Sequence, residues 1–134
     1  MTTARCEAGL FQGITMTPIT KPELANGERY IGAIVDAAGV ATHIILLPGS
    51  PKATWKAAKT WAASIGGDLP NRVEQALLFA TAKDEFEEYG YWSNELYASV
   101  SGFAWSQYFD YGYQYDHGVY GELRARAVRR LIIQ

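Results

Sequence analysis

Cysteine and histidine are scarce in this sequence. Its 134 residues include one cysteine, Cys6, and two histidines, His43 and His117. A single cysteine cannot form a disulfide within the chain, and no Cys-x-x-Cys or His-x-x-x-His spacing indicates a zinc site. We therefore predict no disulfide, no bound metal and no cofactor, and a chain suited to a reducing compartment.

Long hydrophobic runs and a strong excess of charge are also missing. The longest apolar stretch, residues 44–48, is far shorter than the roughly 20 residues that cross a bilayer. No long apolar run follows the N-terminus, so the sequence predicts no signal peptide. The formal net charge of −2 gives no general attraction to nucleic acid or to anionic membranes. We expect neither a nucleic-acid partner nor membrane association.

The composition is that of one globular domain, because 49% of the residues are hydrophobic and 19% are charged. Residues 1–28 contain scattered glycine and proline and are predicted to form an irregular N-terminal arm. Such an arm could cover a sheet edge, pair with a neighbouring copy to form a homo-oligomer, or stay loose. Residues 29–134 form the predicted domain.

The first half of the domain predicts a hairpin and two helices. Two β-rich runs, residues 30–35 and 42–47, flank a turn. Ser50 and Pro51 favour a helix start, and Gly66-Gly67 ends that helix. Asn71, with Glu74 three residues later, predicts a capping box for a second helix that ends near Asp84. The predicted buried positions of these helices are Trp55, Ala58, Ala62 and Ile65 in the first, and Val73, Leu77 and Ala80 in the second.

The second half predicts strands at residues 91–93, 103–110 and 123–133, separated by turns rich in glycine and tyrosine. Helices segregated from strands in this way indicate an α+β fold in which two helices pack on antiparallel strands. The side chains expected to be mostly buried are Trp55, Trp61, Leu77, Trp92, Trp105 and Phe109.

Charged side chains at the two ends of the domain favour structural roles. A carboxylate from Glu74 is expected to pair with Arg126 or Arg129 on the last strand. The alternative is a phosphate-binding stripe of Arg124, Arg126, Arg129 and Arg130, which the net charge of −2 disfavours. The acidic residues 84–88 are interpreted as a solvated helix end rather than a calcium loop, and both histidines as structural.

Several motifs resemble the C-type-lectin-like family. The closest subgroup is a set of bacterial and phage domains of unassigned function, which includes the C-terminal lectin-like domain of a bacterial collagen-like adhesin. The matching stretches cover roughly residues 30 to 131 and include Gly66-Gly67-Asp68-Leu69-Pro70-Asn71-Arg72-Val73-Glu74, Tyr91-Trp92-Ser93, Ala104-Trp105 and Arg126-Ala127-Val128-Arg129. The resemblance implies a C-type-lectin-like fold. The absence of a signal peptide and the single cysteine favour a location in the cytoplasm of a host cell or in a virion.

The sequence departs from the active members of that family. Calcium-dependent lectins use a Glu-Pro-Asn or Gln-Pro-Asp loop and a Trp-Asn-Asp strand, of which Trp92-Ser93-Asn94 is at best a remnant. The oxidase relatives that make formylglycine need a cysteine pair. The resemblance therefore implies a binding domain and no enzyme.

Tyrosines are concentrated near the C-terminus, where eight of the nine lie between residues 89 and 120. Tyrosine offers a large rigid contact area and a hydroxyl at low entropic cost, and it dominates adaptable binding surfaces. Aromatic residues also favour strands, but so many tyrosines cannot all be buried in a small domain. The predicted ligand-binding residues are Tyr108, Asp110, Tyr111, Tyr113, Gln114, Tyr115, Asp116, His117 and Tyr120.

The sequence thus predicts a non-enzymatic recognition module, encoded by a phage or prophage, that binds a protein or a glycan through this tyrosine-rich face. Two alternatives stay open. One is an intracellular inhibitor that binds a host defence complex. The other is a structural or assembly subunit of a phage particle, with residues 1–28 as the interaction arm.

Overall fold

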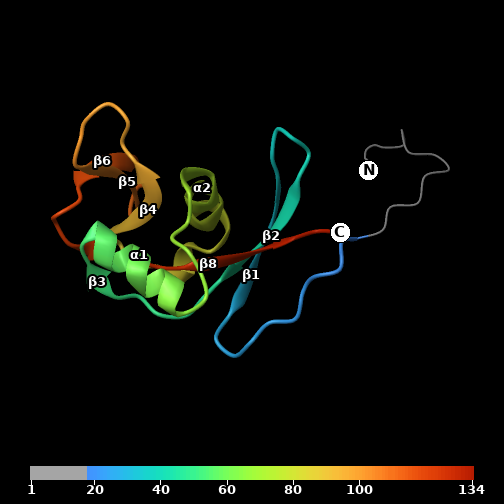
Figure 1. Cartoon of the computed structure of the whole chain (residues 1–134). Coiled ribbons are helices and arrows are strands. Elements are labelled where there is room, and N and C mark those ends of the chain that lie inside the picture. Colours follow the sequence, from blue (N-terminus) through green and yellow to red (C-terminus); the bar gives the residue numbers. More distant parts are fainter. Residues whose placement is uncertain (1–17) are drawn as a thin grey trace.

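Two sheets and two helices make up the part of the chain that the computed structural model describes, residues 18–134 (Figure 1). The α+β class predicted from the sequence is confirmed. The elements in chain order are β1 (Arg29–Val35), β2 (Ala41–Leu46), β3 (Lys52–Ala53), α1 (Trp55–Ser64), α2 (Arg72–Thr81), the short 3-10 helix η2 (Lys83–Glu85), β4 (Gly90–Leu96), β5 (Phe103–Tyr108), β6 (Gln114–Gly118), β7 (Leu123–Arg124) and β8 (Val128–Ile132).

The smaller sheet has the strand order β1-β2-β8, and its first two strands are the predicted hairpin. The last strand of the chain pairs antiparallel with β2, so this sheet joins the beginning and the end of the domain. Ile44, Ile45 and Leu46 in the central strand β2 are at most 1% exposed. Their burial on both faces of β2 makes this strand the centre of the small sheet.

The larger sheet has the order β3-β7-β4-β5-β6, which leaves β6 at one edge. The neighbouring residues Tyr91 and Trp92 of β4 are both buried but belong to different hydrophobic clusters. Successive side chains of a strand point to opposite faces, so each face of this sheet has its own core. The Trp92 face packs against α1, and the Tyr91 face packs against α2.

Helix α1 begins later than predicted. Its N-cap is Thr54, not Ser50, and its first helical residue is Trp55. Lys52 and Ala53 form strand β3 with β7 instead, and the main-chain N–H of Ala125 donates to the Pro51 carbonyl at 2.9 Å. Long-range pairing with the end of the chain thus overrides a favourable local helix start. Ile65, predicted to be buried, is 41% exposed.

Helix α2 has the predicted capping box but presents a different face to the core. Asn71 and Glu74 cap each other's main-chain N–H groups at 2.8 Å, as expected. The helix ends at Thr81, before Asp84. Its buried residues are Glu74, Gln75 and Leu78, whereas Val73 is 62% exposed, Ala80 is exposed and Leu77 is half-buried. The predicted stripe was wrong because two buried side chains are polar and form hydrogen bonds inside the domain.

The C-terminal half contains two differences from the predicted strands. Residues 123–133 do not form one strand, because β7 belongs to the larger sheet and β8 to the smaller one. Between them, Ala125, Arg126 and Ala127 cross the core and are at most 6% exposed. Residues 114–118, predicted to lie in a turn-rich region, form strand β6.

The predicted core residues divide into two groups. Trp92 and Phe109 are buried as expected, at 0% and 1% exposure. The other four are only half-buried; they are Trp55, Trp61, Leu77 and Trp105. Of these, Trp55 and Trp61 pack against the cluster that contains Trp92.

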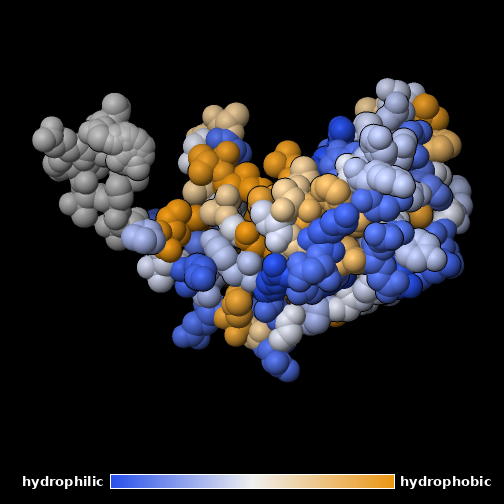
Figure 2. All heavy atoms as spheres, turned by 180° about the vertical axis from the view of Figure 1, so that it is seen from behind, coloured by the Kyte–Doolittle hydropathy of each residue, from blue (hydrophilic) through white to orange (hydrophobic). Residues whose placement is uncertain are grey.

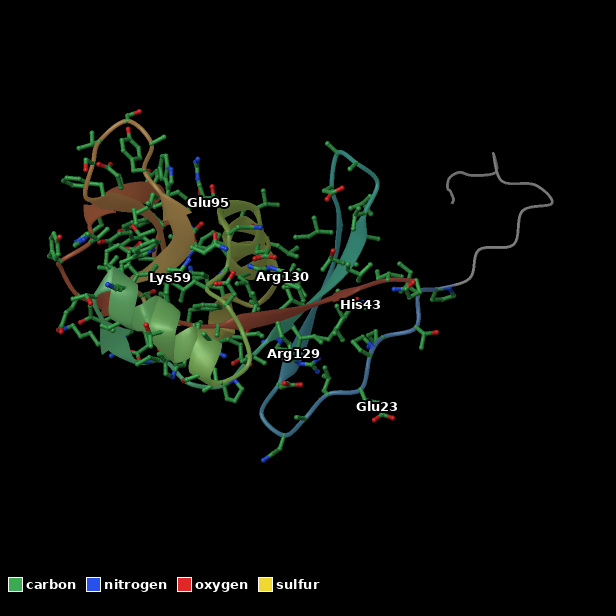
Figure 3. The ribbon with its side chains drawn as sticks, viewed as in Figure 1. Glu23, His43, Lys59, Glu95, Arg129 and Arg130 are labelled. Atoms are coloured by element: carbon green, nitrogen blue, oxygen red, sulfur yellow. The ribbon has the colours of Figure 1, made fainter. Side chains whose placement is uncertain are left out.

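The carboxylate partner of the last strand is Arg130, so the predicted pair of Glu74 with Arg126 or Arg129 was wrong. Arg130 donates to both Glu74 oxygens at 2.6 and 2.8 Å and to Asp68 at 3.0 Å. Successive side chains of β8 point to opposite faces, so Arg129 and Arg130 lie on different sides of the strand (Figure 3). Arg129 therefore binds Glu28 instead. Arg126 contacts Glu85 and the carbonyl of Leu47.

The end of the predicted arm is attached to the domain. Glu28 accepts hydrogen bonds from Arg129 at 2.8 and 3.0 Å, and Arg129 also donates to the Glu23 carbonyl at 3.2 Å. Residues 18–28 form no helix or strand. Residues 1–17, with Cys6, lie outside the described residues, and so does most of the arm through which a homo-oligomer was predicted.

The ion pairs of β8 predict a loss of stability in acid. Burial by itself raises the pKa of Asp68, but hydrogen bonds from Asn94 and Arg130 outweigh it and lower that pKa below its usual value. The hydrogen bond from Arg129 likewise lowers the pKa of Glu28. A depressed carboxyl pKa stabilises the fold above the unfolded-state pKa of about 4, and that stability is lost as the pH falls through the folded-state pKa.

We therefore expect the melting temperature to be nearly constant from about pH 7 to pH 5 and to fall below about pH 4. The double variant Glu28→Gln/Asp68→Asn should be less stable than wild type at pH 7 and should lose less on acidification. Thermal melts at a series of pH values measure both effects. An acid slope equal to that of wild type would show that other carboxylates control the acid sensitivity.

Candidate interaction site

The free end of the larger sheet carries the predicted tyrosines. Tyr115 lies directly opposite Ser106 on β5, and Tyr108 and Tyr113 are two residues from these partners on the same face. This is the face that α1 covers at the other end of β5, where Ala104 is fully buried. The tyrosines lie outside that hydrophobic cluster.

Four tyrosine rings form a continuous ladder, which we call the tyrosine face: Tyr108, Tyr115, Tyr113 and Tyr111. Their neighbouring ring centroids are 5.6, 5.8 and 6.5 Å apart. Tyr111 is 82% exposed, Tyr113 58% and Tyr115 49%. Rings with centroids at these distances pack against one another even though they are largely exposed to solvent. The prediction that several tyrosines face solvent is confirmed.

A pocket of about 320 Å³ adjoins the ladder at Tyr108. Its walls include Tyr89, 56% exposed, and Arg124, whose guanidinium lies 5.4 Å from the centre of the Tyr89 ring. The Tyr108 ring packs directly on the backbone of Gly90, where an added Cβ would lie 2.7 Å from it. Gly90 therefore lets Tyr108 form both a wall of the pocket and the first ring of the ladder.

The other predicted site residues are placed differently. Gln114 and Asp116 lie on the opposite face of β6, and the amide of Gln114 is already bonded to Arg72 and Gln107. His117 is half-buried, with its ring 5.5 Å from that of Trp92 and Nδ1 3.1 Å from the Gly118 carbonyl oxygen. Asp110 accepts the main-chain N–H of Tyr111 at 2.7 Å, so it shapes the loop. Tyr120 is 90% exposed on the loop after β6.

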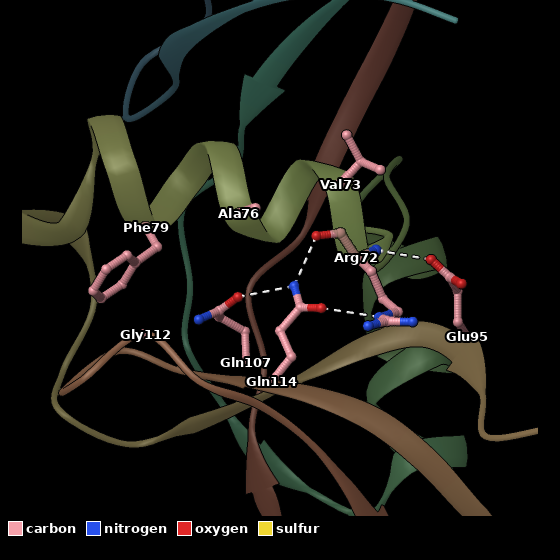
Figure 4. A pocket seen from close by; sticks show the side chains of 8 residues that line it. All are labelled: Arg72, Val73, Ala76, Phe79, Glu95, Gln107, Gly112 and Gln114. Atoms are coloured by element: carbon pink, nitrogen blue, oxygen red, sulfur yellow. Dashed lines mark hydrogen bonds between the residues drawn. The ribbon is translucent and has the colours of Figure 1, made fainter. Parts of the chain in front are cut away.

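A second concave surface, which we call the α2 groove, was not predicted. It lies between α2 and strands β5 and β6 and has a volume of about 540 Å³ (Figure 4). Val73, Ala76 and Phe79 of α2 form its apolar wall, and Gln107 and Gln114 lie on the side of the sheet. The sequence signal was present, because Val73 and Ala76 are apolar residues on a helix whose core face contains Glu74 and Gln75. Because Val73 was assigned to the predicted buried stripe, the α2 groove was not predicted.

Arg72 closes one end of the α2 groove. Its guanidinium stacks on the Trp105 ring at 3.6 Å, and its Nε donates to Gln114 at 2.9 Å. Its main-chain N–H donates to the carboxylate of Glu95 at 2.8 Å (Figure 4). The side chain is therefore held in one position, while within residues 18–134 its two Nη atoms have no hydrogen-bond or salt-bridge partner.

Hydrophobic side chains also gather around the β1-β2 hairpin and α2 on the back of the molecule (Figure 2). A hollow of about 420 Å³ lies between them, lined by Ile34, Val35 and Val40 of the hairpin region and by Val73 of α2. Val35 is 65% exposed. Val73 thus stands on a ridge between this hollow and the α2 groove.

Several ionisable side chains of the described region form contacts within the fold, among them the ion pairs of Arg129 and Arg130. The His43 ring nitrogen Nδ1 lies 2.8 Å from the hydroxyl of Tyr30. In residues 18–134 no group of three or more His, Cys, Asp or Glu side chains is arranged to hold a metal ion. In the same residues, no helix has the length and apolar character needed to cross a membrane.

Comparison with known proteins adds no assignment. No protein-family model matches the sequence, and no curated protein is significantly similar to it. The tyrosine face and the α2 groove are therefore the basis for inferring a function.

Proposed function

We propose that this protein is a non-enzymatic recognition module that binds a protein partner through the tyrosine face. The observation that carries the proposal is the ladder of Tyr108, Tyr115, Tyr113 and Tyr111 at the free end of the larger sheet. A fold gains little from tyrosines that are 49–82% exposed. Binding energy, in contrast, concentrates in a few aromatic and arginine anchors that desolvate on contact.

A protein partner suits this face better than a glycan. The predicted polar companions Gln114 and Asp116 lie on the other face of β6, and Asp110 is bonded to its own loop. The charged side chains near the ladder, Lys52, Glu122 and Arg124, line the pocket at its Tyr108 end, away from the more exposed rings of Tyr111 and Tyr113. Phenol rings alone match the mixed apolar and polar surface of a protein.

The C-type-lectin-like relationship is part of the same proposal. It is supported by the order of a hairpin, two helices and antiparallel strands, which the resemblance implies. The same tyrosine face would serve an adhesive part of a virion or an intracellular inhibitor of a host defence complex. Neighbouring genes for tail proteins favour the first role, and neighbouring defence antagonists favour the second.

Alanine at Tyr111, Tyr113 and Tyr115 together should abolish capture of the partner and leave the melting temperature nearly unchanged. Loss of a single anchor worth about 2 kcal/mol already weakens binding roughly thirtyfold. The measurement is capture from a host lysate, followed by titration with the purified partner and a thermal melt of each variant. A matched control is Lys56→Ala/Thr60→Ala on the exposed side of α1, which should bind as wild type does.

Deletion of residues 1–22 separates the tyrosine face from the arm. We expect the deletion variant to bind the partner with wild-type affinity. If the deletion abolished binding and the triple tyrosine variant retained it, the arm would carry recognition. That outcome would favour the structural or assembly subunit.

A further inference from the structure

Strand β6 is an open edge of the larger sheet and separates the tyrosine face from the α2 groove. Tyr108 donates its N–H to the Tyr113 carbonyl, and Val119 donates to the Gly102 carbonyl. In an antiparallel pair, hydrogen-bonded pairs alternate with pairs that do not bond to each other. The N–H and C=O groups of Gln114 and Asp116 therefore point away from β5, and in residues 18–134 they have no partner.

We propose that an extended peptide segment of the protein partner adds to β6 as a further strand and places a carboxylate on Arg72. The proposal rests on the proposed function, since it takes the partner to be a protein. The main-chain groups of Gln114 and Asp116 supply the pairing. An added strand points alternate side chains to opposite faces, so one set reaches the tyrosine face and the other reaches the α2 groove.

The lining of the α2 groove determines which side chains of the added strand can bind there. Val73, Ala76 and Phe79 offer an apolar wall to one or two aliphatic side chains. The shape is fixed because Gly112 packs on Phe79, where an added Cβ would lie 2.6 Å from the ring. The main chain at Gly112 has φ +85°, which glycine adopts without strain.

Arg72 specifies a carboxylate. Its guanidinium is fixed by Trp105 and Gln114, and its two Nη atoms are open to the groove in the region that the structure describes. Two parallel N–H groups match the two oxygens of a carboxylate. The carboxylate could belong to an acidic side chain or to the C-terminus of the peptide, and both would bind Arg72 in the same way. Glu95 lines the same end, so its charge opposes this binding.

The probe is an eight-residue random peptide library displayed in two formats, one with a free C-terminus and one tethered at both ends. We expect selection on the wild-type protein to enrich peptides that have apolar residues at alternate positions and one carboxylate. Enrichment of an acidic side chain in the tethered format identifies that source, and enrichment only in the free format identifies the C-terminus. Failure to enrich any peptide in either format would overturn the proposal.

Surface variants then test whether the enriched peptides bind in the α2 groove. Val73→Glu places a charge on an exposed wall of the groove and should weaken binding at least tenfold, whereas Ala57→Glu at an exposed position of α1 should have no effect. Glu95→Gln keeps an oxygen for the Arg72 N–H and should strengthen binding several-fold. Equal affinity of wild type, Val73→Glu and Glu95→Gln would overturn the proposal.

Hydrogen exchange tests strand addition directly. The amides of Gln114 and Asp116 should exchange rapidly in the free protein and gain protection when an enriched peptide binds, whereas those of Tyr115 and His117 should be protected in both states. Unchanged exchange at Gln114 and Asp116 would overturn strand addition.

Binding of the natural partner separates this inference from the proposed function. If the triple tyrosine variant loses the natural partner while Val73→Glu keeps it, this inference fails and the proposed function stands. If instead Val73→Glu loses the natural partner while the triple tyrosine variant keeps it, the α2 groove binds the partner and the tyrosine face does not.

Discussion

Replacement of Trp92 by alanine should lower the free energy of unfolding by about 3–5 kcal/mol. Trp92 is fully buried against α1, and its indole N–H donates to the carbonyl of Ala53 at 2.8 Å. The truncation leaves a cavity at the centre of one core and leaves that carbonyl without a partner. Chemical denaturation followed by fluorescence or circular dichroism measures the loss.

Trp105→Ala is the matched control. The Trp105 side chain is half-buried and packs on Arg72 and Tyr97 at the surface, so less apolar area is lost than at Trp92. We expect the free energy of unfolding to fall by roughly half as much. Equal losses at the two positions would mean that the two tryptophans are equally important to the core. That result would contradict the difference in burial.

Replacement of Glu74 by glutamine should lower the free energy of unfolding by about 3 kcal/mol, near the lower end for a broken buried pair. The Glu74 side chain is 3% exposed and both its oxygens accept from Arg130. Glutamine can still cap Asn71 but removes the charge that faces the guanidinium. The value lies near the lower end because Arg130 is 30% exposed and retains Asp68.

A double-mutant cycle identifies the true partner of Glu74. Glu74→Gln combined with Arg130→Gln should show a coupling energy above about 1 kcal/mol, whereas the cycle with Arg126→Gln should show almost none. Asp84→Asn is the surface control, because its pair with Arg29 is largely exposed and is worth at most about 1 kcal/mol. Strong coupling between Glu74 and Arg126 would restore the pair expected from the sequence.

The candidate site shows what local patterns can predict. Alternation of tyrosine with Gly112 and Gln114 correctly indicated that some of these rings face solvent. The same pattern did not show that Gln114 is bound to Arg72, since these residues are 42 positions apart. The α2 groove was missed because apolar residues on a helix were assigned to the core. Glu74 and Gln75 occupy that position instead, each held by partners on distant strands.

The sequence by itself determined the features that depend on neighbouring residues. These are the hairpin, the capping box of α2, the end of α1 at its glycines and the α+β class. The tertiary structure decided the start of α1, the division of the last strand and the partner of each arginine. At the start of α1, long-range main-chain pairing outweighs a local preference of about 1 kcal/mol. The other two depend on which distant strands and carboxylates the folded chain places beside β7 and β8, and no short stretch of sequence encodes the identity of those partners.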